Sequence, residues 1–244
     1  MYFKLRTIGL FLILLLHTAY SQNNQSNLTA YDYYLEGIQH TNSGNWFKAI
    51  RSYESSIRLD SSNYDVWYNL GIARCQLGMW TKSTLAFLKA IQIKPDFYEA
   101  YNNLGLAYYK LKNFSDAKKH YELSLKYNPE QAEAYRNFGI LLLEIEKYIE
   151  SIPLLVTAIS KYPNDPELYS GLGWALYNIE QYNNAIVAFQ KSIDKRPNHV
   201  NTLYNFGLTY IELNQKEHAL EIYQRLKKLD KITAKSLYYL IQKM

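Results

Sequence analysis

The sequence is poor in cysteine. Cys75 is the single cysteine among 244 residues, so no disulfide can form within the chain, and the fold must be stabilised by side-chain packing. Cys75 lies in a helical pattern beside apolar neighbours, and this position predicts that its thiol is buried.

Long apolar runs are also few. A run over residues 8–16 follows the positive charges of Lys4 and Arg6. Its nine residues are about half of the ~20 that a membrane-spanning helix needs. Ala19 and Ser21 then place small residues at the two positions that a signal peptidase reads.

This pattern predicts a secretory signal peptide over residues 1–21, followed by a polar linker over residues 22–29. No cysteine stands at the cleavage point, so the signal is not that of a lipoprotein. We expect the mature protein to be secreted across the inner membrane into the periplasm or cell envelope. The alternative is an uncleaved N-terminal segment that anchors the protein in the membrane.

Charge of one sign is not in large excess. The chain has 27 Lys and Arg against 22 Asp and Glu, a formal net charge of +5. Removal of residues 1–21 takes away Lys4 and Arg6 and leaves +3. This balance lacks the basic stripe of a nucleic-acid binder, and solvated helix faces explain the lysines of residues 216–243. We therefore expect no nucleic-acid partner.

Catalytic and cofactor motifs are missing. The histidines are scattered without the H-E-x-x-H spacing of a zinc site, and no serine has a G-x-S-x-G setting. The pair Gly171 and Gly173 resembles the start of a dinucleotide-binding loop, but it follows no predicted strand and falls inside a helical pattern. We predict that the protein is not an enzyme and needs no cofactor.

A repeat with a period of 34 residues organises most of the chain. Six glycines have this spacing: Gly37, Gly71, Gly105, Gly139, Gly173 and Gly207. A small residue follows each of them: Ala49, Ser83, Ala117, Ser151, Ala185 and Ala219. A large residue comes next: Tyr53, Phe87, Tyr121, Leu155, Phe189 and Tyr223. Four units end near a proline: Pro95, Pro129, Pro163 and Pro197.

Each unit has the pattern of two helices. In the unit that begins at residue 98, apolar residues recur three and four positions apart over 101–111 and again over 114–125. The proline closes the second helix, because proline in a helix interior loses a hydrogen bond and clashes with the preceding turn. The recurrent glycine and small residues let the two helices approach closely. The sequence thus predicts an all-α chain of antiparallel helix pairs.

The segment W-Y-N-L-G-I-A over residues 67–73, the segment A-K-K-H-Y over residues 117–121 and the terminal proline resemble the tetratricopeptide repeat (TPR). The resemblance implies an α-solenoid in which the helix pairs stack into a right-handed superhelix. Six units fit the repeat: 30–63, 64–97, 98–131, 132–165, 166–199 and 200–233.

The ends depart from the pattern, as terminal repeats often do. The first unit has Glu36 where others have Leu or Phe, and the last unit lacks the proline. Residues 234–244 are predicted to form one further short capping helix, in which Leu237, Leu240 and Ile241 cover the last apolar face.

The helix face opposite the glycines is the candidate binding surface. Successive helical residues rotate by ~100°, so the residue two positions before each glycine points about 160° away from it. In TPR arrays the first helix of each pair lines the concave surface, so these residues are expected to face the groove. They are Leu35, Asn69, Asn103, Asn137, Gly171 and Asn205.

Asparagine has two donor hydrogens and an acceptor oxygen on a short side chain. A row of asparagines can therefore hydrogen-bond the backbone of an extended peptide and ignore its side chains. The row resembles the asparagine ladder of the TPR domain of O-linked N-acetylglucosamine transferase, which grips peptide backbones in this way. The alternative is that the asparagines are solvated surface residues.

Acidic side chains flank the row one helical turn earlier. They are Asp65, Glu99, Glu133 and Glu167. Glu144 and Glu212 project nearby, and Lys110 and Arg136 are the only cations expected on this face. The groove should therefore be more acidic than the whole protein, and its partner should be neutral to basic.

These features favour an exported scaffold or adaptor that binds a protein or extended peptide. The carboxylate clamp, with which TPR co-chaperones hold acidic tails, is excluded, because its basic positions hold Glu99 or Tyr34. The alternative function is that of a structural subunit whose convex face or ends dock into a cell-envelope assembly or secretion complex, with membrane-bound envelope complexes among its partners.

Overall fold

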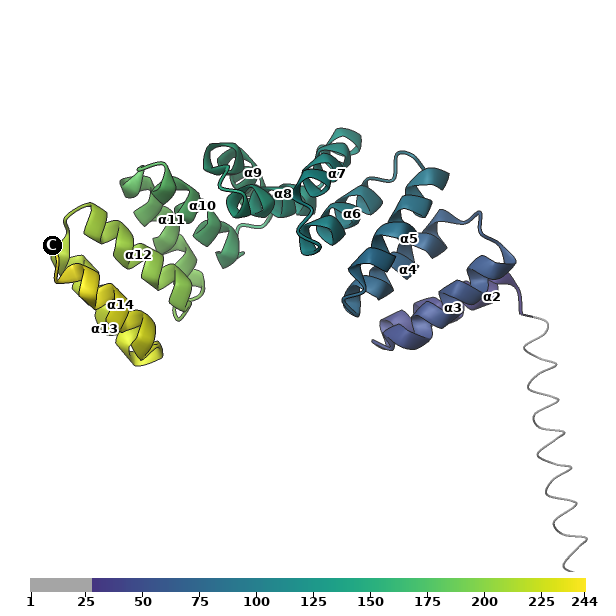
Figure 1. Ribbon diagram of the computed structural model, residues 1–244, viewed down its shortest axis with the longest axis horizontal. Coiled ribbons are helices and arrows are strands. Elements are labelled where there is room, and N and C mark those ends of the chain that lie inside the picture. The colour runs from purple at the N-terminus through teal and green to yellow at the C-terminus, as the bar shows by residue number, and fades with distance from the viewer. Residues whose placement is uncertain (1–27) are drawn as a thin grey trace, which may run out of the picture. The chain divides into compact units, whose positions relative to one another are not determined.

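The computed structural model of the protein describes residues 28–244. The signal peptide predicted over 1–21 lies outside the described residues, as does most of the polar linker. Thirteen helices and no strand form within residues 28–244 (Figure 1). The predicted all-α solenoid of helix pairs is confirmed.

The helices alternate between a first and a second helix of each pair. The first helices are α2 (Ala30–Asn42), α4 (Tyr64–Gln76), α6 (Tyr98–Lys110), α8 (Ala132–Glu144), α10 (Pro166–Asn178) and α12 (Val200–Glu212). The second helices are α3 (Trp46–Leu59), α5 (Trp80–Ile93), α7 (Phe114–Tyr127), α9 (Tyr148–Lys161), α11 (Tyr182–Lys195) and α13 (Lys216–Leu229). A final helix, α14, spans Lys231–Ile241. None of the helices between residues 28 and 244 is long and apolar enough to span a membrane.

Polar side chains fix the starts of several helices. At the start of α2, the Thr29 hydroxyl accepts from the Asp32 N–H, and the Asp32 carboxylate accepts from the Thr29 N–H at 2.8 Å. This reciprocal pair satisfies two of the backbone donors that every helix start leaves open. Asn45, Asn113 and Asp165 cap α3, α7 and α10, and each of these side chains accepts one backbone N–H of the first helical turn.

The described chain forms two compact units, and the division falls between Ala100 and Tyr101, inside α6. In the unit that ends at Ala100, Tyr53, Val66 and Leu70 form part of the buried core. The unit Tyr101–Met244 has its own buried clusters, the largest of which runs from α10 to α14.

The repeated glycines are the points at which paired helices touch. A Cβ atom placed on Gly37, Gly71, Gly105, Gly139 or Gly173 would lie between 2.4 and 2.9 Å from the side chain sixteen positions later. Those side chains are Tyr53, Phe87, Tyr121, Leu155 and Phe189, and each is fully buried. Real Cβ atoms do not approach other atoms so closely, so only glycine fits without displacing the large side chain.

The sixth glycine has a different neighbour. The three atoms nearest to a Cβ on Gly207 belong to Leu237 of α14, the first at 2.6 Å, and not to Tyr223 of its own repeat. Tyr223 is half-buried and stacks on Tyr238, with ring centroids 4.7 Å apart. The capping helix therefore supplies the large residue for the last glycine.

The cap begins earlier than the predicted segment 234–244. Asp230 caps α14, since its carboxylate accepts hydrogen bonds from the backbone N–H groups of Ile232 and Thr233. The helix therefore starts at Lys231, three residues before the predicted boundary, because the N-cap residue decides where a helix begins.

The turn inside each pair has left-handed backbone at one register position. The residues are Gly44, Gly78, Lys112, Glu146, Glu180 and Asn214, with φ between 55° and 70°. After α6, the N–H of Asn113 donates to the carbonyl of Tyr108 at 2.9 Å, which is the long hydrogen bond of a Schellman motif. Glycine occupies this position without strain, whereas Lys and Glu do so at a cost of about 1–2 kcal/mol.

Replacement of Gly105 by leucine should destabilise the second unit. The new side chain would meet the Tyr121 ring at 2.8 Å and the backbone carbonyl of Ala117 at 3.2 Å, and overpacking of this kind costs ~1–3 kcal/mol or more. Thermal unfolding followed by circular dichroism measures the loss. Lys119→Leu, at an exposed position of α7, is the control, and equal melting temperatures for both variants would contradict the contact.

Replacement of Glu146 by glycine should stabilise the protein. Its φ of 58° is strained for a residue with a Cβ, and the relief exceeds the extra chain entropy of glycine by about 0.5–1 kcal/mol. Urea unfolding measures the gain. The reciprocal change Gly78→Ala, at φ 69°, should lower the free energy of unfolding. A loss of stability in Glu146→Gly would show that the backbone at Glu146 is not strained.

Candidate binding site between neighbouring first helices

A pocket of about 380 Å³ opens in the unit Tyr101–Met244. It lies between first helices of neighbouring repeats, α6 and α8, and reaches the segment before α10. Its lining residues are Asn102, Asn103, Leu106, Glu133, Arg136, Asn137, Tyr162 and Asp165. The fold thus brings together three of the residues predicted for the groove: Asn103, Glu133 and Asn137.

A hydrogen bond between asparagines crosses from one repeat to the next. Asn137 Nδ2 of α8 donates to Asn102 Oδ1 of α6 at 3.1 Å. Asn102 is only 2% exposed, so this bond satisfies a buried acceptor, which would otherwise carry a desolvation cost. Sequence reasoning missed Asn102, because other repeats have tyrosine, arginine or serine at its register position.

The first unit has a related contact. Asn69 of α4 donates from Nδ2 to the backbone carbonyl of Asp65 at 2.8 Å. Burial raises the pKa of the Tyr34 hydroxyl, and a hydrogen bond from Asn69 opposes that shift. Tyr34 precedes Asn69 by the same interval that separates Asn102 from Asn137. In both places an asparagine of the row contacts the preceding repeat.

The remaining members of the row differ in their surroundings. Asn205 is half-buried on α12, where its backbone carbonyl accepts from Thr209. Gly171 faces Leu143, since a Cβ at this glycine would lie 3.0 Å from the leucine side chain. Leu35 is exposed on α2. Neither Asn205 nor Glu167 lines the pocket.

The pocket holds one cation among acids. Arg136 Nε lies 3.1 Å from Asp165 Oδ2 in an ion pair, and the second Asp165 oxygen accepts the backbone N–H of Glu167 at 2.9 Å. Glu133 is exposed at the same pocket. The carboxylate of Asp165 is already paired with the guanidinium of Arg136. The exposed carboxylate of Glu133 is therefore the acid that is available to a ligand in the pocket.

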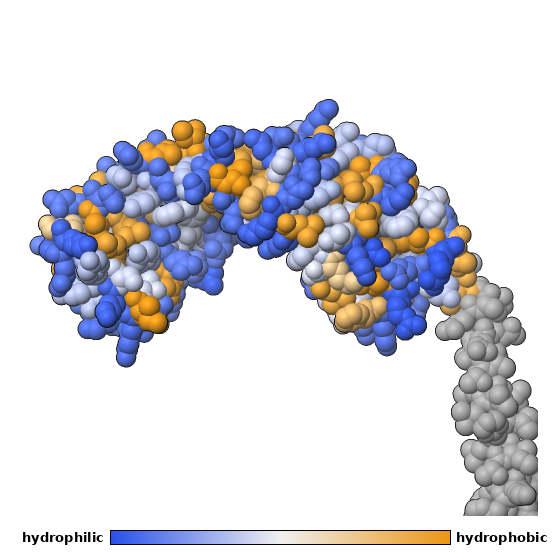
Figure 2. Space-filling model, in the orientation of Figure 1, coloured by the Kyte–Doolittle hydropathy of each residue, from blue (hydrophilic) through white to orange (hydrophobic). Residues whose placement is uncertain are grey.

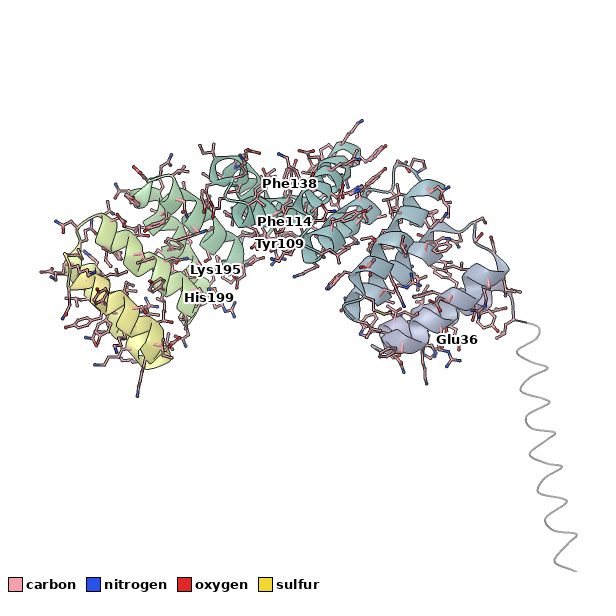
Figure 3. All side chains as sticks on the ribbon, viewed as in Figure 1. Glu36, Tyr109, Phe114, Phe138, Lys195 and His199 are labelled. Carbon is pink, nitrogen blue, oxygen red and sulfur yellow. The ribbon has the colours of Figure 1, made fainter. Side chains whose placement is uncertain are left out.

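Ion pairs from other repeats engage several acids of the predicted groove. Glu167 pairs with Arg196, and its Oε1 lies 3.9 Å from His199 Nε2 (Figure 3 labels His199 at the start of α12). Glu144 pairs with Lys112 at 2.9 Å. The partners in these two ion pairs lie about one repeat apart in the sequence. Neighbouring positions therefore give no sign of them, and neither ion pair was predicted from the sequence.

The tyrosines next to the row pack inward. The Tyr34 ring lies 6.2 Å from that of Tyr53, and the Tyr68 ring lies 4.8 Å from that of Phe97 and 5.9 Å from that of Phe87. Aromatic pairs at these distances contribute packing energy to a core. These two side chains therefore support the fold of the first unit.

A second pocket, of about 470 Å³, lies between α2 and α3. Its lining is polar: Tyr33, Glu36, His40, Lys48, Arg51, Ser52 and Ser55. His40 Nε2 lies 3.6 Å from Glu36 Oε1, and Figure 3 labels Glu36 on α2. No binding role is predicted for these residues from the sequence.

Cys75 is half-buried rather than fully buried, and burial raises its thiol pKa while a hydrogen bond with Ser83 opposes the shift. Between residues 28 and 244, no group of three or more His, Cys, Asp or Glu side chains is placed to hold a metal ion.

His120 of α7 is a buried titratable group. Its ring stacks on Tyr108 at 5.4 Å and on Tyr101 at 6.0 Å, and within the described residues its Nδ1 has no hydrogen-bond partner. Burial lowers the pKa of His120, the charge of Lys119 lowers it further, and Asp116 opposes the shift.

Stability should therefore fall in mild acid. The unfolded chain takes up a proton at the ordinary His pKa of about 6.5, whereas folded His120 stays neutral to lower pH. The contribution of neutral His120 to the free energy of unfolding is fully present above that pKa. Below it, the free energy of unfolding falls by at most ~1.4 kcal/mol per pH unit. Urea unfolding of wild type and His120→Phe between about pH 7.5 and 5.5 isolates this contribution. Identical pH dependence in the two proteins would exclude it.

Comparison with known families agrees with the repeat architecture. Sequence profiles described as tetratricopeptide repeat match residues 98–131, 137–200 and 200–233, and a profile described as TPR repeat matches residues 73–112. Together these matches extend over more than half of the chain. No curated protein matches the sequence.

Solved structures share the fold at low sequence identity. The crystal structure of YrrB, titled a TPR protein with an unusual peptide-binding site, is 21% identical with a TM-score of 0.70, over 77% of this chain and 97% of YrrB. PilF of Pseudomonas aeruginosa is 16% identical with a TM-score of 0.73, over 86% of this chain and 96% of PilF.

MamA of Desulfovibrio magneticus is 21% identical with a TM-score of 0.66, over 69% of this chain and 95% of the MamA chain. The shared 34-residue register, the helix pairs that it forms and the matching profiles lead to one conclusion: the chain belongs to the tetratricopeptide repeat family.

Proposed function

We propose that the protein is an exported adaptor of the cell envelope that binds a protein or extended peptide along its first helices. TPR proteins are interaction scaffolds, which supports the general role. The observation that carries the site is the pocket between α6 and α8, because three asparagines line it: Asn102, Asn103 and Asn137.

The Asn137 side chain retains hydrogen-bonding capacity for a ligand. Asn137 donates one of its two side-chain N–H groups to Asn102. Its second N–H and its Oδ1 oxygen can therefore hydrogen-bond a peptide backbone. Glu133 stands beside them. The site therefore offers the donors and acceptors that an extended peptide backbone requires, with a carboxylate at its rim.

The charge at the rim favours a neutral to basic ligand. Asp165 occupies the guanidinium of Arg136 at 3.1 Å, whereas no side chain among residues 28–244 forms an ion pair with Glu133 within 4.0 Å. YrrB, whose title names a peptide-binding site, has the same fold. The fold shared with YrrB and the asparagine-lined pocket together support our proposal that this chain also binds a peptide.

A structural subunit is the second candidate, and one helix favours it. On the outer face of α9, Ile149 is 75% exposed and Val156 is 50% exposed, with exposed Pro153 between them. Residues spaced by three and four positions share one helix face, so these three form an apolar stripe. The corresponding face of α7 carries Lys119 and Glu122 instead. This stripe would dock into an envelope assembly.

Replacement of Asn69, Asn103 and Asn137 together by alanine should weaken binding of a peptide captured from envelope extracts. Each hydrogen bond lost is worth ~0.5–1.5 kcal/mol, so the affinity should fall by roughly tenfold to a thousandfold. Because Asn137 also satisfies Asn102, the titration must be run well below the melting temperature of the variant. Isothermal titration calorimetry with the captured peptide gives the affinity.

Asn42, Asn183 and Asn198 are exposed asparagines away from the pocket, and their triple alanine variant is the matched control. The control should bind as wild type does. Glu99→Gln with Glu133→Gln should weaken a basic ligand mainly at low salt, since exposed charges are screened over ~8–10 Å at physiological salt. Wild-type affinity in the asparagine triple variant would leave the structural subunit as the better candidate.

A further inference from the structure

The net charge of the chain resides in its last 23 residues. Residues 222–244 contain six basic side chains and one acidic side chain, a balance of +5 that equals the formal net charge of the whole chain. The preceding 221 residues therefore carry equal numbers of basic and acidic side chains. The six basic residues are Arg225, Lys227, Lys228, Lys231, Lys235 and Lys243.

The one acid of this segment is committed to the helix start. Asp230 accepts hydrogen bonds from Ile232 N at 2.8 Å, from Thr233 N at 3.2 Å and from Thr233 Oγ1 at 2.8 Å. The hydrogen bonds from Thr233 lower the pKa of Asp230, and that from Ile232 lowers it further. The Asp230 carboxylate is thus engaged in capping the N-terminus of α14.

The lysines lack acidic partners within the fold. Among residues 28–244, none of the five lysines lies within ion-pair distance of an acid. Lys243 lies instead over the Tyr239 ring at 4.2 Å, and Lys227 lies over the Tyr223 ring at 5.9 Å. All five lysines are exposed, so their positive charge faces solvent and is not neutralised by an acid within residues 28–244.

Apolar side chains stand among these lysines. Ile232 is 82% exposed and Tyr239 is 59% exposed, and both lie on the face of α14 that carries Lys235, at intervals of three and four residues. Lys243 follows in the turn after the helix. The opposite face of α14 buries Ala234, Leu237 and Ile241. Figure 2 shows apolar side chains between hydrophilic ones at this C-terminal end.

We propose that the outer face of α14, together with the last turn of α13, docks on an anionic lipid membrane. A cluster of four to eight basic residues on an amphipathic helix is attracted to anionic lipid, with ~1 kcal/mol from each cation near the surface. Ile232 enters the acyl boundary, and Tyr239 takes the interfacial position that suits an aromatic ring with a polar tip.

The composition favours lipid over an acidic protein. Five of the six cations are lysine, a compact charge on a flexible stem that suits many mobile headgroups. Fixed carboxylates are recognised better by the two-pronged guanidinium of arginine. The one arginine, Arg225, donates to the backbone carbonyl of Pro197 at 3.0 Å. This surface is separate from the α6–α8 pocket, and its role does not depend on peptide binding.

Flotation of the full chain with vesicles tests the proposal. Phosphatidylcholine vesicles with phosphatidylglycerol should bind the protein more tightly than pure phosphatidylcholine vesicles, and high salt should abolish the difference. The triple variant Lys231→Gln, Lys235→Gln, Lys243→Gln should lower affinity for the anionic vesicles on the order of 100-fold. Ile232→Ser should lower it several-fold, with a loss that persists in high salt.

The matched control removes three lysines from other helices. Lys82, Lys119 and Lys126 are exposed, and their triple glutamine variant has the same net charge as the α14 variant. It should bind as wild type does; an equal loss would assign the effect to net charge alone and overturn the proposal. Equal wild-type affinity for both vesicle types, with lysine-dependent binding to polyglutamate, would overturn it in favour of an acidic protein. Circular dichroism checks that each variant is folded.

Discussion

The close contact between a glycine and a large buried side chain joins the two helices of each of the first five pairs, and in the sixth repeat it joins α12 to α14. Phe189 is fully buried because Gly173 leaves room for its ring, and a Cβ at that glycine would lie 2.6 Å from it. Burial of such a side chain contributes roughly 1.5–3 kcal/mol. The same contact fixes the rotation of each first helix, so its opposite face points away from the pair. The position of Asn137 in the α6–α8 pocket follows from this rotation.

The contact also determines how the array ends. A solenoid repeat buries one face against its neighbour, and the last repeat needs a substitute. Here α14 is that substitute, because Leu237 lies against Gly207 where Tyr223 would stand in the other repeats. Among the helices of residues 28–244, α14 comes last, and Ile232 and Tyr239 on its outer face are exposed, with Lys243 over the Tyr239 ring. The cap that closes the core is thus free to carry a second role on its other side.

The periodic features were predictable from sequence, and the features specific to single repeats were not. The 34-residue spacing of Gly105 and its counterparts predicts where the helices pair, because sterics repeat with the sequence. The Asn137–Asn102 bond and the Glu167–Arg196 pair depend on residues that vary among repeats. The start of α14 at Lys231 depends on a cap residue that the repeat pattern does not contain. Sequence periodicity therefore predicts the scaffold, whereas the chemistry of the pocket requires the structure.

A double-mutant cycle at the last glycine tests this account most directly. Gly207→Ala places a methyl group against Leu237, so its cost in urea unfolding should shrink by ~1 kcal/mol or more when Leu237→Ala is also present. The same change combined with Tyr223→Ala should be additive within ~0.3–0.5 kcal/mol. Coupling of Gly207 to Tyr223 and not to Leu237 would contradict the account, because the sixth repeat would then pair its helices as the others do.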